Sequence, residues 1–191
     1  FDDVDDGIGE PVLTTTAYNN RKAKASLAIR NYLRFPDVLA VVEVENLTTL
    51  QSLAAQVNAD AVANSQPNPL YEAFLVEGND VGGIDVGFLL KRQIAFGSTP
   101  RISGSTIVQE LDASTYIDSC TLLPDVLHDR PPLRFTGTVN GVSGASFPIT
   151  VIAVHNRSLG SANSETACAI PANGTTGNRG RITRQKQADD I

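Results

Sequence analysis

The sequence predicts an α+β fold in which stacked β-sheets are covered by helices. The order of the elements is the first observation: a helical pattern, a strand and a second helical pattern come first, and several strands then follow in succession. This order favours stacked sheets flanked by helices over a regular βαβ alternation. Composition is the second observation, because 191 residues with 41% hydrophobic and 19% charged residues are enough for one domain with a core.

Two amphipathic helical patterns lie on either side of a strand near the start of the chain. Residues 21–34 place apolar side chains at helical spacing, and Pro36 ends this pattern. Residues 38–44 are short, almost wholly apolar and rich in valine, which is typical of a strand buried on both faces. Asn46 has the side chain of an N-cap, and a second helix is predicted over residues 47–57.

Strands dominate the middle of the chain. Strand-like runs at residues 73–76 and 84–91 are joined by residues 77–83, whose glycine, asparagine and aspartate content is typical of a loop. Residues 93–130 are expected to hold one or two strands followed by an irregular loop.

The last third of the chain contains a predicted hairpin, a loop and a helix. The Asn-Gly pair at residues 140–141 is a strong turn signal between two strands, 133–139 and 148–154. Residues 159–177 are rich in small polar residues and are expected to form a long exposed loop, and the pattern of residues 178–191 predicts a helix.

Charge and chain ends limit the function classes. The formal net charge of −6 argues against a wide basic nucleic-acid surface, although a nuclease that works through a small cationic pocket and a metal remains compatible with it. No apolar stretch is long enough to span a bilayer, so a soluble protein without a membrane span is expected. Because the sequence contains no methionine and its last helix has no terminal cap, both ends are interpreted as cuts.

The two cysteines fit neither a zinc ligand set nor a redox CxxC pair. Cys120 and Cys168 both lie in polar, loop-like surroundings. A disulfide that connects two surface loops is the favoured interpretation, and it would imply an oxidising compartment. Two buried free thiols are the alternative.

Two acidic residues lie in otherwise apolar strands. Glu43 follows five apolar residues, so its carboxylate is expected where desolvation is costly and where a divalent cation could be its partner. Glu45 lies two positions further on the same strand face. Asp85 lies just inside the run at residues 84–91 and would need a bonding partner. The structural alternatives are an exposed glutamate at a strand end and an aspartate that caps a turn.

Three basic residues are candidates for proton transfer and phosphate binding. His155 follows a buried strand and has a side chain that titrates near neutrality, which suits proton transfer. Arg130 precedes two prolines, a stiff frame, and Arg157 follows the histidine by two positions. Either guanidinium could bind a phosphate bidentately. The alternatives are a hydrogen-bonded core histidine and surface ion pairs of little consequence.

Four segments extend in order over most of residues 20–185: PDVLAVVEVEN at 36–46, GIDVGFLLKR at 83–92, DRPPL at 129–133 and HNRS at 155–158. Together they resemble motifs of the endonuclease/exonuclease/phosphatase (DNase I-like) superfamily, and the branch similar to bacterial extracellular nucleases is the best match. Val42 stands where the family usually has glutamine.

The resemblance implies a fold and the position of this chain within it. The family fold is a four-layer αββα sandwich, of which residues 1–191 would form the N-terminal portion of a single domain. A metal-site asparagine would precede Phe1, and a Gly-Asp-x-Asn motif and a second catalytic histidine would follow Ile191. The isolated fragment is therefore expected to be inactive.

The resemblance also implies a reaction, the hydrolysis of a phosphodiester in a nucleic acid or a related substrate. Glu43 would hold Mg²⁺, with Ca²⁺ or Mn²⁺ as alternatives, and Asp85 would orient His155 for proton transfer. Arg130 and Arg157 would bind phosphate oxygens. A secreted or cell-surface bacterial enzyme is expected.

Two other functions remain open at this point. The same sandwich could serve a secreted protein as a non-catalytic binding module, because a fold alone does not define a function. The chemistry could also act on a phospholipid headgroup or a phosphomonoester, and the acidic charge mildly favours a small or flexible substrate over long duplex DNA. The oligomeric state is not predicted.

Overall fold

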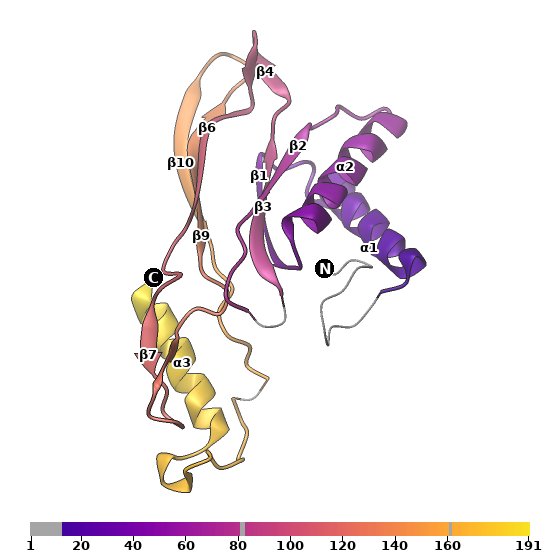
Figure 1. Ribbon diagram of the computed structural model, residues 1–191. Helices are drawn as coiled ribbons and strands as arrows, with labels where there is room; N and C mark the ends of the chain where they lie inside the picture. Colours follow the sequence, from indigo (N-terminus) through magenta and orange to yellow (C-terminus); the bar gives the residue numbers. More distant parts are fainter. Residues whose placement is uncertain (1–12, 81–82, 161) are drawn as a thin grey trace.

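The computed structural model describes residues 13–80, 83–160 and 162–191. The interpretation of the first residues as a cut end therefore lies outside the described residues. The α+β class is confirmed, because the described residues combine α-helices with sheets whose strands are all antiparallel. Figure 1 shows a sandwich of helices and sheets in the upper part of the view and a smaller lobe, which contains β7 and α3, below it.

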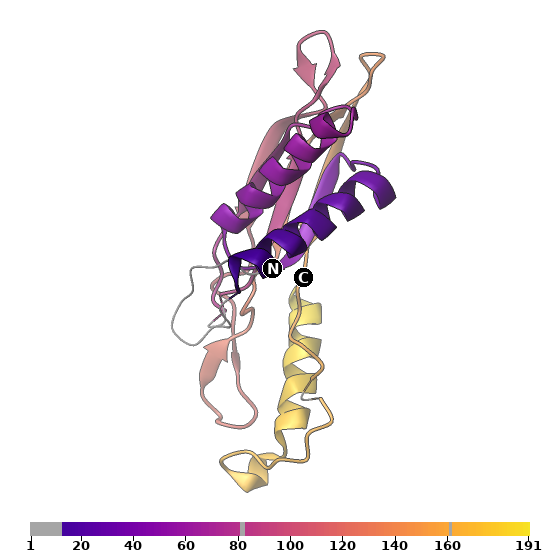
Figure 2. The same cartoon turned by 90° about the vertical axis from the view of Figure 1, so that its right-hand side faces the viewer.

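Two helical segments form one outer layer. Helix α1, Thr15–Leu27, continues as the π-helix η1, Ala28–Tyr32, and α2 spans Leu47–Ala63. The predicted N-cap is confirmed, because the side chain of Asn46 accepts a hydrogen bond from the backbone N–H of Thr49 at 2.7 Å. The segment α1–η1 begins six residues before the predicted start and ends at Tyr32, and α2 ends six residues after its predicted end, since propensity patterns locate helix ends poorly. Figure 2 shows α1 and α2 side by side over the first sheet.

The first sheet has the order β1-β3-β2 and is antiparallel throughout. Its strands are β1, Val38–Val44, β2, Tyr71–Leu75, and β3, Asp85–Lys91. The predicted burial of β1 on both faces is wrong, because β1 is an edge strand with several exposed side chains. The central strand β3 is the most buried, with every residue but Lys91 buried, since it has a neighbouring strand on each side and packed layers on both faces.

The second sheet has the order β10-β9-β6 and is also antiparallel. Its strands are β6, Ile102–Gln109, β9, Leu133–Asn140, and β10, Ser146–Ala153. The predicted hairpin between the last two strands is confirmed, with residues 141–145 as its loop. Gly144 in that loop has φ +84°, a backbone conformation that favours glycine.

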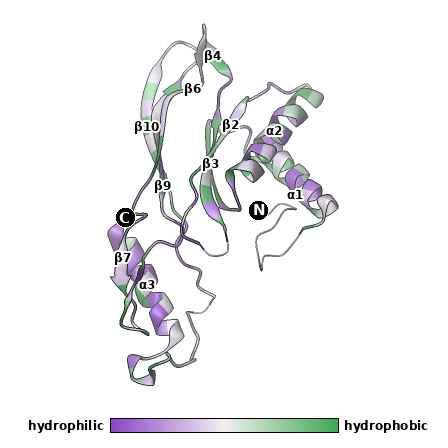
Figure 3. Cartoon of the chain, viewed as in Figure 1, coloured by the Kyte–Doolittle hydropathy of each residue, from purple (hydrophilic) through white to green (hydrophobic). Residues whose placement is uncertain are grey.

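Apolar side chains form two cores, one on each face of the first sheet. The core between the helices and the sheet contains Leu50, Val57 and Leu89, and the core between the sheets contains Phe88 and Phe135. In Figure 3 green, hydrophobic residues occur in the strands of both sheets and in α2. The described residues thus form three layers, α, β and β, and within them no helix covers the outer face of β10-β9-β6.

Residues 93–130 contain more strands than predicted, because short hairpins leave little periodicity to detect. Besides β6, this segment contains β4, Ile94–Phe96, β5, Thr99–Pro100, β7, Thr115–Ile117, and β8, Pro124–Val126. The last elements of the chain are the 3-10 helix η2, Pro171–Asn173, and α3, Thr176–Asp190.

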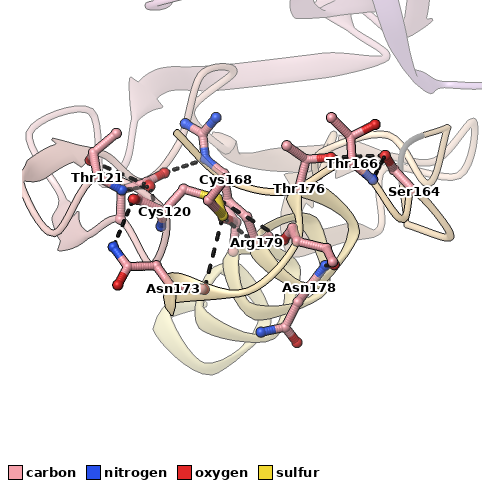
Figure 4. The surroundings of a disulfide bond; sticks show 12 residues. Cys120, Thr121, Ser164, Thr166, Cys168, Asn173, Thr176, Asn178 and Arg179 are labelled. Atoms are coloured by element: carbon pink, nitrogen blue, oxygen red, sulfur yellow. Dashed lines mark hydrogen bonds and ion pairs between the residues drawn. A yellow bond between two sulfur atoms is a disulfide. The ribbon is translucent and has the colours of Figure 1, made fainter. Parts of the chain in front are cut away.

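The smaller lobe packs α3 against the β7–β8 hairpin. Arg179 of α3 pairs with Asp118 and Asp125 of the hairpin. The predicted disulfide between Cys120 and Cys168 is present, and it joins this hairpin to the loop that precedes α3 (Figure 4). Two chain segments 48 residues apart are therefore held together covalently.

Candidate functional site

The candidate site begins with a β-bulge at the end of β1. Val42 pairs with Val86 and Val44 pairs with Asp85, so Glu43 is the extra residue on its strand. Its φ of +58° is a left-handed conformation that non-glycine residues rarely adopt. Bulges and strained residues of this kind are frequent beside functional sites, where they redirect a side chain.

The bulge corrects one expectation from the sequence. The side chain of Glu43 is 63% exposed, so its carboxylate is not desolvated within the strand as predicted. The bulge turns it out of the regular alternation. Glu45, two positions further on, is the buried carboxylate of this segment, with a residue exposure of 8%.

The bulge brings Glu43 to His155, which lies two residues beyond β10. Oε1 of Glu43 is 3.5 Å from Nε2 of the His155 imidazole. The edge strands β1 and β10 belong to different sheets but face each other across the sandwich (Figure 1). Two side chains 112 residues apart therefore meet at the same end of the two sheets.

Charged groups of both signs surround this imidazole. Burial lowers the pKa of His155, and the positive charge of Arg130 lowers it further, while Glu43 and Asp80 act in the opposite direction. The net effect is a lowered pKa, so the neutral imidazole is favoured at neutral pH. A neutral imidazole can accept a proton, as a general base must.

Three buried polar atoms around His155 have no hydrogen-bond partner among the described residues. They are Nε of Arg130, Nδ1 of His155 and Oδ1 of Asn156. Buried polar groups are usually satisfied, and each unsatisfied group costs about 1–3 kcal/mol. One of these atoms is a hydrogen-bond donor, one is an acceptor, and one is an imidazole nitrogen. Unpartnered polar atoms of this kind are typical of a site that binds a polar ligand.

Asp85 makes its contacts elsewhere. Its Oδ1 accepts a hydrogen bond from the backbone N–H of Gly78 at 2.8 Å. Burial and a hydrogen bond with Glu77 raise the pKa of Asp85 to about 7. Because Nδ1 of His155 has no partner within the described residues, the expected hydrogen bond from this nitrogen to Asp85 is not seen. Asp85 instead anchors the loop that follows β2.

That loop connects Asp85 to the segment that carries Arg130. A Cβ added to Gly78 would lie 2.5 Å from Oδ1 of Asp85 and 2.8 Å from Cδ of Pro131. Only glycine therefore fits between the acid and the proline that follows Arg130. Asp85 supports the site through this packing.

Arg157 lies at the junction with the smaller lobe. Its backbone N–H donates to Oε1 of Gln187 at 2.9 Å, and its carbonyl oxygen accepts from Arg184. These contacts hold its backbone to α3. Within the described part of the chain, its guanidinium makes no hydrogen bond or ion pair with Glu43, Asp85, Arg130 or His155.

Sequence reasoning did not identify Asp80 and Asn156 as parts of this site. Asp80 lies in the loop between β2 and β3 and contributes to the electrostatic potential at His155. Its role depends on a loop conformation, which the sequence does not encode in a periodic signal. Asn156 could have been noticed, because it follows the candidate histidine directly.

The residues fit one kind of metal site. Among the described residues, no three histidine, cysteine, aspartate or glutamate side chains are grouped so that they could hold a metal ion by themselves. Mg²⁺ commonly keeps several waters and is bound by one or two carboxylates together with substrate phosphates. The exposed carboxylate of Glu43, close to unpartnered polar atoms, fits that mode.

Comparison of the chain with family models, with curated proteins and with solved structures finds no match. Across residues 13–80, 83–160 and 162–191, no helix combines the length and apolar character needed to cross a membrane.

Proposed function

We propose that the chain belongs to a Mg²⁺-dependent phosphodiester hydrolase, most simply a nuclease. The observation that carries the proposal is the convergence of Glu43, His155 and Arg130 at one end of the two sheets. An anionic metal ligand, a proton-accepting imidazole and a guanidinium can together serve metal-assisted phosphodiester hydrolysis. The resemblance of four sequence segments to the endonuclease/exonuclease/phosphatase superfamily supports the same reaction.

Each residue has a role that follows from its position. His155 exchanges a proton with the attacking or leaving oxygen, because its lowered pKa keeps the imidazole neutral at neutral pH. Arg130 donates to a phosphate oxygen, which would satisfy its buried Nε. Glu43 would hold Mg²⁺, which when bound neutralises charge that develops on the phosphate.

The disulfide and the net charge bear on where the protein acts and on how it binds its substrate. The Cys120–Cys168 disulfide supports a secreted or cell-surface location, because disulfides persist in oxidising compartments. The net charge of −6 favours a small cationic site that binds one phosphodiester group of the substrate over a wide basic surface that binds many phosphates.

The test measures cleavage of a simple phosphodiester, bis(4-nitrophenyl) phosphate, by the protein as it occurs naturally, with and without Mg²⁺. Glu43→Gln and His155→Ala should each reduce the rate by about 10²–10⁴, whereas the control Glu165→Gln, at an exposed residue, should not. Retained activity in both variants would contradict the site. A wild-type protein that binds phosphodiesters but does not cleave them would be a binding module instead.

A further inference from the structure

A cavity of about 490 Å³ lies at a different place in the fold, beside the end of α1–η1 and the end of α2. It takes no part in the proposed function. Four polar and two nonpolar residues line it, and none of them is acidic: Arg30, Asn31, Arg34, Phe35, Gln66 and Pro67.

Arg30 is the buried arginine that lines this cavity. The residue is 8% exposed, and its hydrogen bonds go only to neutral acceptors. Nε donates to Oγ of Ser26 at 3.3 Å, and Nη1 donates to Oε1 of Gln66 at 2.8 Å and to the carbonyl oxygen of Asp60 at 3.5 Å. Among the described residues, Nη2 makes no hydrogen bond and Arg30 makes no ion pair.

The carboxylate of Asp60 is linked to Arg30 through the hydroxyl of Ser26. Ser26 donates to Oδ2 of Asp60 at 2.6 Å, and Gln56 donates to Oδ1 at 2.8 Å. Both oxygens of Asp60 are thus engaged, and its side chain does not line the cavity. A buried guanidinium without a direct counter-ion is costly, because desolvation of the charge is not offset by a Coulombic partner.

A second guanidinium, that of Arg34, opens onto the same cavity. It makes no hydrogen bond or ion pair within the described part of the chain. Arg34 and Phe35 both have φ +56°, and the π-helix η1 immediately precedes them. Left-handed non-glycine residues and π-helical turns are each unfavourable and are frequent at functional sites. Both Arg34 and Arg30 line the cavity that follows this turn.

The helix ends do not remove the need for a counter-ion in the cavity. The C-terminal ends of η1 and α2 each contribute roughly half a negative charge. Together they offset about one of the two guanidinium charges, and Nη1 of Arg30 already contacts a carbonyl at the end of α2. Asp60 acts from behind Ser26, so the groups that face the cavity directly remain cationic.

We propose that this cavity is a second, separate oxyanion site that binds a phosphate group. Arg30 can donate a hydrogen bond to a tetrahedral oxyanion from its unpaired Nη2, and Arg34 can donate a pair of hydrogen bonds to it. The volume exceeds that of inorganic phosphate, and Phe35 and Pro67 offer apolar surface, which suits a phosphate carried on an organic molecule. The site is distinct from that of Glu43, because β1 separates them by roughly 20 Å at about 3.3 Å per residue.

The experiment titrates inorganic phosphate into the chain in magnesium-free buffer with a chelator. Binding is followed by the NMR signals of the backbone amides of residues 31–35 and of the Nε–H group of Arg30. Arg34→Gln should weaken phosphate binding by at least about tenfold, because a charge-assisted contact is lost. The matched control is Arg21→Gln, at an exposed arginine of α1, which should bind as the wild type does.

Further arms distinguish the ligand chemistry and the location. Acetate should bind more weakly than phosphate, and a nucleoside monophosphate more tightly than either. Arg30→Gln should also weaken binding, and if that variant does not fold, Arg34→Gln alone decides. Wild-type affinity in Arg34→Gln, or signal changes around His155 and not around residues 31–35, would overturn the proposal.

Discussion

Oε1 of Glu43 lies 3.5 Å from Nε2 of His155, and this contact joins the end of β1 to the end of β10 across the two sheets. It exists because a β-bulge gives Glu43 a left-handed backbone and turns its side chain out of the regular strand alternation. The strain is thus located at the residue that would hold the metal.

The charges around His155 predict opposite effects for two substitutions. Glu43→Gln should lower the pKa of His155, because it removes an anion that stabilises the imidazolium. Arg130→Gln should raise it, because it removes a cation that opposes protonation. An NMR titration of the imidazole Hε1 signal measures both shifts. Shifts of the same sign in the two variants would contradict the arrangement.

The raised pKa of Asp85 predicts that the stability of the fold depends on pH. Its pKa is raised from 3.8 to about 7, so between about pH 4 and pH 7 the folded protein keeps a proton that the unfolded chain has lost. Stability should therefore fall as pH rises through this window and level off above pH 7. At about 1.4 kcal/mol per pKa unit, the loss is at most about 4 kcal/mol.

Asp85→Asn tests this linkage, because asparagine keeps an acceptor for the N–H of Gly78 but does not titrate. Urea unfolding of both proteins at pH 4, 6 and 8 gives the two slopes. The variant should gain stability relative to the wild type as pH rises. Parallel pH profiles would show that Asp85 titrates normally in the folded protein.

Gly78 is predicted to be essential for the packing between Asp85 and Pro131. Gly78→Ala would place its Cβ 2.5 Å from Oδ1 of Asp85 and 2.8 Å from Cδ of Pro131, so it should destabilise the fold by about 1–3 kcal/mol. Gly160→Ala is the matched control, since its Cβ would meet only Oγ of Ser158 at 3.4 Å. Equal unfolding midpoints for the two variants would rule out the tight packing.

The disulfide is predicted to stabilise the smaller lobe. A cross-link over 48 residues restricts the unfolded chain, and replacing Cys120 and Cys168 with serine should cost about 3–4 kcal/mol. Hydrogen exchange of β7, β8 and α3 should accelerate more than that of β3, because the bond lies within that lobe. Uniform acceleration over the whole chain would indicate a single cooperative unit instead.

Much of the fold was predictable because periodic patterns act locally. Asn46 showed the start of α2, and the Asn-Gly pair at 140–141 showed the hairpin of the second sheet. The edge position of β1 was not predictable, since an apolar strand reads the same whether or not a neighbour pairs with it. Short strands such as β7 and β8 carry too few residues for a period to emerge.

The sequence indicated which residues belong to the candidate site better than it indicated the contacts between them. The strand ends indicated Glu43 and His155 as residues that could meet. The bulge that joins them depends on strand pairing between β1 and β3, which no local pattern encodes. The partners of Asp85 depend on the path of the loop after β2, where Gly78 approaches closely enough to replace the expected histidine as its hydrogen-bond donor.

The most direct test of the account is a Mg²⁺ titration observed at the two histidines, because the sequence contains only His128 and His155. His128 is buried beside Asp190 in the smaller lobe and is an internal control. Mg²⁺ should shift the imidazole signals of His155 and leave those of His128 unchanged, and Glu43→Gln should abolish the shift. No change at His155, or an undiminished change in Glu43→Gln, would contradict a metal site at Glu43.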